Sequence, residues 1–278
     1  WREEVVLKDG RLRAFADMGF GVLDAMVETA ACVLDVRGSD DPALFVRALE
    51  EKVEEKGLAI SQALSNHDDP RCFTVRPASL EQVPNSPLCY WVSDRVRALF
   101  RELHSFEGEG RTAKVGLQTG DDFRFVRLWT EVAPEKIGSK WFPFAKGGAY
   151  SPYYANLHLV VNWEDGGQEI RGFVDPRTGK QRSRPQNTQF YFRPGLTWSR
   201  RTTSDISVGV LPRGCVFADK GPAVFAQSDE ELLPLAGFLN SQTAKELISL
   251  MLGAADAAAR SYEVGIVQKI PLVCLDGV

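Results

Sequence analysis

Aromatic and cationic residues recur together in three segments of the chain, at 115–129, 141–154 and 187–201. In the first segment a polar turn bounded by Gly116 and Gly120 leads into alternating aromatic and arginine residues. Cationic side chains attract phosphates, and side chains with amides or hydroxyls can contact base edges. Three such clusters in one region predict a surface that contacts a partner.

The charge of the chain is segregated. The formal net charge is −4, but residues 111–201 contain 15 Lys and Arg against 8 Asp and Glu, a local balance of +7 that leaves −11 elsewhere. Within 171–201 there are eight cations and a single acid, Asp175. A field of this kind holds a duplex through salt-sensitive phosphate contacts, and arginine can also pair bidentately with guanine. For residues 177–184 alone, a solvated basic loop is the alternative interpretation.

Several side chains have both a DNA-binding and a structural interpretation. Gln118 could read adenine bidentately and Thr119 could meet a phosphate or a thymine methyl, or their turn could cap the next segment. Lys146, followed by two glycines, suits a phosphate or an ordinary turn. Asn187 could contact a base or bond a loop, and Trp198 could contact nucleic acid or enter the core. The predicted DNA-binding set is Gln118, Thr119, Arg124, Lys146, Tyr153, Arg182, Arg184, Asn187, Arg193, Trp198, Arg200 and Arg201.

The elements expected before residue 110 are helices and a strand. The apolar run 29–36 has the composition of a buried strand in a helix-covered sheet. Apolar residues at helical spacing predict an amphipathic helix over 42–56, and a second helix begins near Ser93. The glycine-rich link 105–111 is the expected domain boundary.

Beyond this link the pattern becomes shorter and more strand-like, then returns to helix. Residues 229–252 predict a helix broken or bent at Asn240-Ser241, with 254–260 as its extension. Strands are expected at 157–161, 190–192, 206–210, 215–218 and 223–226, with Lys220-Gly221 as a hairpin turn between the last two.

Composition restricts the remaining classes of function. Trp91, Trp163 and Phe217 lie in apolar contexts and are expected in the core. The five cysteines form no Cys-x-x-Cys pair and the three histidines are isolated, which predicts reduced, mostly buried thiols and no metal site. No apolar run reaches about 18 residues, so we expect a cytoplasmic protein without a membrane span.

The sequence resembles the large adenine-specific DNA methyltransferases of phage-defence (BREX-type) and type IIG restriction-modification systems. Residues 115–270 resemble the target-recognition region of that family through Gly116-Leu117-Gln118-Thr119-Gly120-Asp121, Lys146-Gly147-Gly148, Asn187, Phe190-Tyr191-Phe192, Thr197-Trp198-Ser199, Leu239-Asn240-Ser241 and Ile270-Pro271. Three upstream segments resemble the end of the family's methyltransferase domain: Asp17-Met18-Gly19-Phe20-Gly21-Val22-Leu23-Asp24, Val27-Glu28-Thr29-Ala30 and Tyr90-Trp91-Val92-Ser93.

The resemblance implies an α/β fold: the end of a Rossmann-like methyltransferase domain over 1–105, then a mixed α/β target-recognition domain over 106–278. It also implies sequence-specific recognition of double-stranded DNA as part of an N6-adenine DNA methyltransferase. The partners would be DNA, the upstream catalytic domain of the same protein and other subunits of the defence system. The alternative is a protein-interaction or scaffold domain of such a complex that has no DNA affinity of its own.

The chain lacks the residues that would carry methyl transfer. A methyltransferase of this class holds the flipped adenine with an Asn/Asp-Pro-Pro-Tyr/Phe loop, and the nearest string here is Ser151-Pro152-Tyr153-Tyr154. The cofactor-binding glycine turn is not recognisable either, and no nucleophile–base pair or phosphate loop can be assembled. Because the chain also begins at Trp1, we expect a piece of a longer protein that is inactive alone. We expect no catalytic or cofactor-binding residues here, and S-adenosylmethionine as the methyl donor of the full-length protein.

Overall fold

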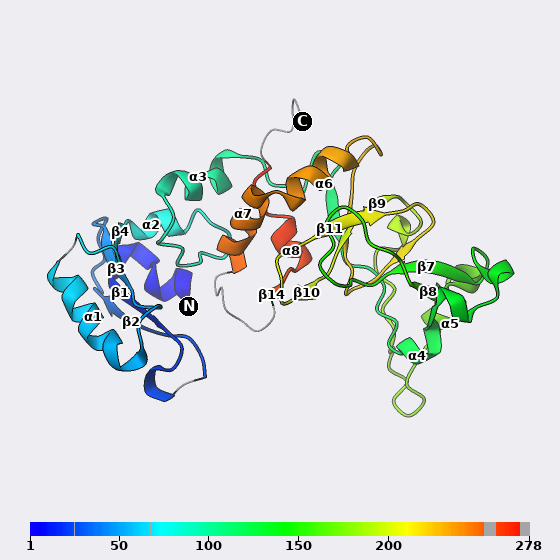
Figure 1. Cartoon of the computed structure of the whole chain (residues 1–278), viewed down its shortest axis with the longest axis horizontal. Coiled ribbons are helices and arrows are strands. Elements are labelled where there is room, and N and C mark those ends of the chain that lie inside the picture. Colours follow the sequence, from blue (N-terminus) through cyan, green and yellow to red (C-terminus); the bar gives the residue numbers. More distant parts are fainter. Residues whose placement is uncertain (25, 67, 253–259, 273–278) are drawn as a thin grey trace. The chain divides into compact units, whose positions relative to one another are not determined.

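The chain forms two compact units in a computed structural model, Trp1–Leu103 and His104–Val278 (Figure 1). The structure describes residues 1–24, 26–66, 68–252 and 260–272. Helices and strands mix in both units, and the strands form several sheets. The fold is therefore mixed α/β, as expected.

The first unit is built on a four-stranded sheet with strand order β2-β1-β3-β4. Strand β1 pairs antiparallel with β2 and parallel with β3, and β4 is antiparallel to β3. Aromatic rings from four segments, those of Phe15, Phe45, Phe73 and Tyr90, pack together, with the rings of Phe45 and Tyr90 stacked at a centroid distance of 4.9 Å. The elements are β1 (Leu12–Gly19), β2 (Thr29–Leu34), β3 (Ala43–Arg47), α1 (Val53–Ser65), β4 (Cys72–Val75), α2 (Pro77–Leu80) and α3 (Asp94–Glu102).

The amphipathic helix predicted over 42–56 was wrong. Residues 43–47 form the central strand β3, in which Phe45 and Val46 are both buried, and helix α1 begins only at Val53. Pairing with β1 on one side and β4 on the other satisfies the backbone of this segment. This pairing joins segments that are distant in the sequence. Its stabilisation of the strand outweighs the helical preference that the spacing of the apolar residues indicated.

The strand predicted over 29–36 is present, but its predicted burial was wrong. Strand β2 lies at the edge of the sheet and its residues are mostly exposed. By contrast, the helix predicted near Ser93 is confirmed, since α3 begins at Asp94. The Ser93 hydroxyl accepts a hydrogen bond from the Val96 amide and caps this helix. Arg97 of this helix is buried and donates to the carbonyl oxygens of Cys89 and Val92 at 3.0 and 2.5 Å.

The second unit contains two four-stranded sheets, with orders β11-β9-β13-β5 and β12-β7-β8-β6, and the short pair β10-β14. Helix α6 packs on β9 and β11, whereas α8 lies against β5 and α7 (Figure 1). The elements are β5 (Thr112–Lys114), α4 (Asp122–Phe125), β6 (Val126–Leu128), β7 (Trp141–Ala145), β8 (Leu159–Asn162), α5 (Gln168–Arg171), β9 (Gly195–Trp198), β10 (Arg201–Thr202), β11 (Val208–Leu211), β12 (Val216–Phe217), β13 (Ala223–Phe225), α6 (Leu232–Asn240), α7 (Gln242–Leu252), β14 (Arg260–Ser261) and α8 (Val264–Val267).

One strand, at 190–192, and one hairpin turn predicted in the second unit were wrong. Thr188–Phe190 form a short 3-10 helix in place of a strand. Lys220-Gly221 is not a hairpin turn, because β12 pairs in parallel with β7 whereas β13 pairs with β9 and β5. The two short strands that flank this turn thus belong to different sheets.

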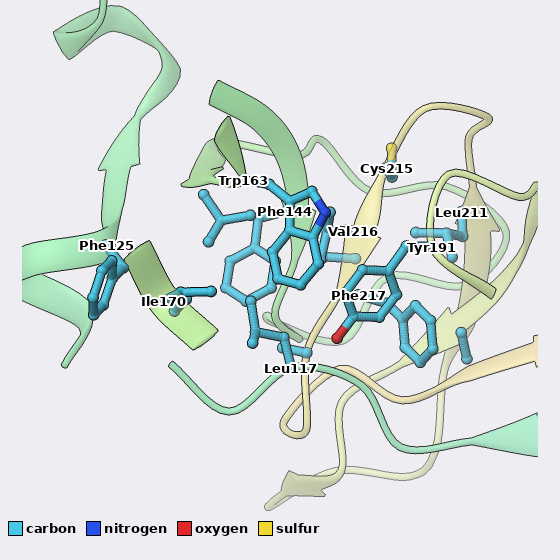
Figure 2. Close-up of a cluster of buried hydrophobic side chains, with 14 of the residues drawn as sticks. Leu117, Phe125, Phe144, Trp163, Ile170, Tyr191, Leu211, Cys215, Val216 and Phe217 are labelled. Carbon is cyan, nitrogen blue, oxygen red and sulfur yellow. The ribbon is translucent and has the colours of Figure 1, made fainter. Parts of the chain in front are cut away.

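Aromatic side chains fill the core of the second unit (Figure 2). Tyr191 lies edge-on to both Trp163 and Phe217, at centroid distances of 5.0 and 5.4 Å. Trp163 and Phe217 are buried as predicted, but Trp91 in the first unit is partly exposed, with Arg47 over its ring. Burial of these rings removes a large apolar area from water and holds the two sheets together.

The predicted break at Asn240-Ser241 is confirmed, since α6 ends at Asn240 and α7 begins at Gln242. The buried Asn240 amide accepts from the Val208 amide at 2.9 Å and donates to the Val208 and Ala236 carbonyls at 2.8 and 2.9 Å. This side chain therefore links α6 to β11. Residues 253–259, most of the predicted extension, lie outside the described residues, and Arg260 belongs to β14.

The expectation of mostly buried thiols holds in part. Cys89 and Cys215 are buried, Cys72 is partly exposed and Cys32 is exposed on β2, while Cys274 lies outside the described residues. Within the described ranges, no three His, Cys, Asp or Glu side chains are grouped so as to hold a metal ion. No described helix is both long enough and apolar enough to cross a membrane.

Candidate nucleic-acid interface

Four segments that are distant in the sequence meet on the second unit. We call them the cationic junction: residues 117–122, 146–148, 182–184 and 219–221. The backbone amide of Gln118 donates to the Arg184 carbonyl at 3.0 Å, and the backbone amide of Arg184 donates to the Gln118 carbonyl at 2.7 Å. The Asp219 amide donates to the Leu117 carbonyl at 3.0 Å. The Arg200 amide also donates to the Lys220 carbonyl at 3.0 Å. All three sequence clusters of aromatic and cationic residues therefore contribute to, or contact, the cationic junction.

Glycines make this convergence possible. Gly120 has φ +76°, and a Cβ atom added there would lie 2.5 Å from the Arg182 carbonyl oxygen. Gly147 has φ +79°, and its added Cβ would lie 2.8 Å from the Lys220 carbonyl oxygen. A side chain at either position would combine backbone strain with a steric clash. These two glycines therefore hold the segments of the junction in contact.

A charged network centred on Asp122 braces the first segment. The Thr119 hydroxyl donates to the Asp122 carboxylate at 2.5 Å, and the Lys146 ammonium also donates to that carboxylate. Burial raises the pKa of Asp122, but the hydrogen bonds from Lys146 and Thr119 and the charge of Lys220 outweigh it and leave this pKa below its ordinary value. The Asp121 carboxylate accepts from the Arg124 amide at 3.1 Å and caps α4. The turn thus has the capping role that was one of its two interpretations.

Arg124 and Arg182 share an aromatic ring but differ in their charge partners. Both guanidinium groups lie over Phe173, each 5.1 Å from its centroid. Arg124 is also ion-paired with Glu169 at 2.9 Å. Among the described residues neither Arg182 nor Arg184 has an ion-pair partner, and both are exposed. Their positive charge is therefore available to an external anion.

The basic loop before Arg182 is ordered around its single acid. The Asp175 carboxylate accepts from the amides of Arg177 and Thr178 at 3.0 and 2.9 Å. These backbone hydrogen bonds lower the pKa of Asp175. The side chains of Arg177 and Lys180 remain exposed, which agrees with a solvated loop that carries positive charge next to the junction.

Trp198, Asn187 and Thr119 each make an internal hydrogen bond, which fits the structural one of their two interpretations. Trp198 is 2% exposed and its indole N–H donates to the Tyr262 carbonyl at 2.9 Å. The Asn187 amide donates to the Val115 carbonyl at 2.8 Å. Thr119 is buried with its hydroxyl committed to Asp122. Burial and internal hydrogen bonds leave Trp198 and Thr119 no free donor for a base, whereas half-buried Asn187 uses one of its two amide N–H groups in this way.

The remaining members of the set are distributed around the unit. Arg193 is exposed, with a hydrogen bond of 3.3 Å to the Ala226 carbonyl. Arg200 lies 3.7 Å from Asp219 and 3.8 Å from Glu263, so its charge is partly compensated. Arg201 on β10 is exposed. Tyr153 is 54% exposed, and its backbone donates a hydrogen bond to the Val208 carbonyl and accepts one from the Val210 amide.

Lys146 borders three neighbouring surface depressions. One, of about 210 Å³, is lined by Gln118 and Lys220 among others, and a second, of about 400 Å³, includes Ser199. The third, of about 560 Å³, is lined by Phe123 and Arg127 among others. Polar, cationic, acidic and aromatic groups therefore line depressions that share Lys146, and the first, second and fourth of these kinds occur at nucleic-acid interfaces.

Two curated proteins are similar to this chain over most of its length. It is 29% identical over 276 residues to an adenine-specific methyltransferase, PglX, of Lacticaseibacillus casei (strain Zhang), a match that covers 94% of the chain and 22% of that protein. It is 30% identical over 240 residues to the adenine-specific methyltransferase BrxX of Escherichia coli O9:H4 (strain HS), covering 83% of the chain and 18% of that protein. The chain is a homologue of one segment of these methyltransferases.

This methyltransferase homologue spans about a fifth of the length of the curated relatives it matches. No family model matches it. Among solved structures it is similar to the type IIG restriction endonuclease BpuSI, at 13% identity and TM-score 0.44, covering 98% of this chain and 38% of that one. It is also similar to the type IIL restriction-modification enzyme MmeI in complex with DNA, at 10% identity and TM-score 0.45, covering 92% and 34%. These TM-scores are too low to establish a common fold.

The structure exposes a further aromatic residue, which the predicted set lacks. Phe123 follows the acidic turn and precedes Arg124, and its side chain is 95% exposed. The sequence signal was the alternation of aromatic and arginine residues over 123–127, but nothing local distinguished Phe123, which is exposed, from Phe125, which is fully buried. Neighbouring aromatics of one segment thus divide between surface and core.

Proposed function

We propose that the second unit binds double-stranded DNA and supplies sequence recognition to an N6-adenine DNA methyltransferase. The observation that carries the proposal is the cationic junction, whose segments contain the exposed residues Arg182, Arg184, Lys220 and Gln118 and are joined by backbone hydrogen bonds. Cations of this kind bind phosphates and fix the register of a protein on the duplex, while an amide can pair bidentately with adenine. The similarity to adenine-specific methyltransferases supports adenine as the modified base.

The chemistry of methyl transfer is assigned to the part of the longer protein outside this chain. The Gly19-Phe20-Gly21 turn is the nearest candidate for a cofactor loop, but protein side chains already occupy the space beside it. A Cβ atom added at Gly19 would lie 2.9 Å from Leu49, and one added at Gly21 would lie 2.9 Å from Val53. These residues do not form a cradle for S-adenosylmethionine. We propose that the first unit is the end of the methyltransferase domain and takes no part in the catalytic step.

Titration of a labelled mixed-sequence duplex with the 278-residue chain tests DNA binding. With about four phosphate contacts, the affinity should fall roughly 100-fold between about 50 and 200 mM salt, because each contact releases condensed counterions. Fluorescence anisotropy at several salt concentrations gives the slope directly. Absence of binding at low salt, or binding that salt does not weaken, would contradict the proposal.

A second function, docking of a protein partner, is favoured by the surface of the first unit. Val33 on the edge strand β2 is 60% exposed, and Val27 and Val36 near its ends are 62% and 82% exposed. Leu23 and Met26 in the preceding loop are 89% and 95% exposed. An apolar edge strand offers unpaired backbone groups and invites another strand to pair. We propose the catalytic part of the same polypeptide as the partner, so that docking complements DNA recognition.

Replacement of Val33 and Val36 together by Asp should abolish this association. Charge on the apolar edge would have to be desolvated on docking, which is costly without a partner group. The measurement is co-purification of the 278-residue chain with the separately expressed remainder of the full-length polypeptide. Leu233→Asp serves as the control, because this side chain is 80% exposed on α6 of the other unit. Equal capture of the double variant and the unmodified chain would exclude β2 as the docking edge.

A further inference from the structure

Phe123 presents a large apolar ring to solvent at the edge of the cationic junction. It belongs to α4, a single helical turn, and is 95% exposed. An aromatic ring is ordinarily core material, and the next aromatic along the chain, Phe125, is fully buried. A single exposed apolar residue is unremarkable by itself, so the support around it decides how it is interpreted.

The backbone that carries Phe123 is held on every side. The Arg127 guanidinium donates to the carbonyl oxygens of Phe123 and Val126 at 2.6 and 2.7 Å. Asp121 caps the turn through the Arg124 amide at 3.1 Å, and Phe125 anchors its far side in the core. The backbone at Phe123 is therefore held in place, so only the side-chain torsions of this residue have to be ordered when it meets a ligand.

Charged side chains of both signs lie around Phe123. The depression that Phe123 lines contains Lys146 and Arg127 together with the acids Asp122 and Glu131, and Lys146 is ion-paired with Asp122. Lys220 lines the adjoining depression, which Lys146 also borders. Arg182 and Arg184 lie on the same junction, as the backbone pairing of Gln118 with Arg184 shows. An exposed apolar ring next to a junction that carries the exposed cations Arg182 and Arg184 resembles proteins that insert an apolar side chain between base pairs while cations hold the backbone.

We propose that Phe123 is a wedge that enters the base stack of bound duplex DNA and partly unstacks one step. This inference rests on the proposed DNA-binding function and adds to it a residue and a mode of selection. Unstacking has a free-energy cost that depends on the step, and pyrimidine–purine steps yield most readily. Phe123 would thus contribute specificity through deformability, at a position where no base edge is read.

The test compares two labelled duplexes that are identical except for one mismatched base pair, which lowers the cost of unstacking. The unmodified chain should bind the mismatched duplex roughly tenfold more tightly than the paired one, within the range of ring–base stacking. Phe123→Ala should remove this preference, and Phe123→Trp should retain it because the ring is kept. A 2-aminopurine base beside the mismatch should brighten on binding of the unmodified chain, since unstacking relieves its quenching, and should stay dim with Phe123→Ala.

The outcomes separate the wedge from DNA binding itself. Leu233→Ala, another exposed apolar truncation in the same unit, should leave both affinities unchanged. If Phe123→Ala binds both duplexes as the unmodified chain does, the wedge is excluded and DNA binding stands. If Phe123→Ala weakens binding to both duplexes to the same extent, the wedge is also excluded. A side chain that contacts DNA without entering the base stack would give that result. Absence of binding to either duplex by the unmodified chain overturns both proposals.

Discussion

Replacement of Arg182 and Arg184 together by alanine should weaken binding to duplex DNA by roughly tenfold or more at about 50 mM salt. Both guanidinium groups are exposed and lack an ion-pair partner among the described residues, so their charge is available to phosphates. If each contacts one phosphate, the plot of log K against log salt should become shallower by roughly 2. Anisotropy titrations at several salt concentrations measure the affinity and the slope together.

The fold should survive this double substitution, because the link between Gln118 and Arg184 is made by backbone atoms. Thermal unfolding followed by circular dichroism checks this point. The charge-matched control is the replacement of Arg2 and Lys8, two exposed cations of the first unit, by alanine. If the control weakens binding as much as the junction variant does, attraction is due to overall charge and the cationic junction is not the DNA-binding surface.

The chain alone should transfer no methyl group and should not bind S-adenosylmethionine, whereas the full-length polypeptide that contains it should methylate adenine. The reason is that the sequence holds no Asn/Asp-Pro-Pro-Tyr/Phe string for a flipped adenine, and that side chains of Leu49 and Val53 fill the space beside the Gly19-Phe20-Gly21 turn. Calorimetry with S-adenosylmethionine and a tritium-methyl transfer assay on mixed-sequence DNA measure the two activities.

Within the full-length protein, the Arg182 and Arg184 double variant gives a matched comparison. It should raise KM for DNA and leave kcat nearly unchanged, because phosphate contacts remote from the reacting base contribute uniform binding. Saturable binding of the cofactor to the 278-residue chain, or methylation above a no-protein control, would show that this chain contains the catalytic part after all.

Where secondary structure was predictable, its determinants are local. The Ser93 hydroxyl caps α3 from three residues away, and the boundary between α6 and α7 follows from residues at the break itself. The segment 42–56 could not be assigned in this way, because β3 is stabilised by pairing with β1 and β4, which lie far from it along the chain. The helical spacing of its apolar residues was a coincidence that non-local pairing outweighed.

The sequence by itself determined the segregation of positive charge into 111–201 and the resemblance to adenine-specific methyltransferases, since both depend only on residue types and their order. Only the tertiary structure decided which of those residues face outward. Trp198 and Asn187 are committed to internal hydrogen bonds, and Arg124 to Glu169, while Arg182 and Phe123 are exposed. Burial and ion pairing depend on which segments meet in space, and this is set by close approaches such as that of Gly120 to the Arg182 carbonyl. No local pattern in the sequence encodes such an approach.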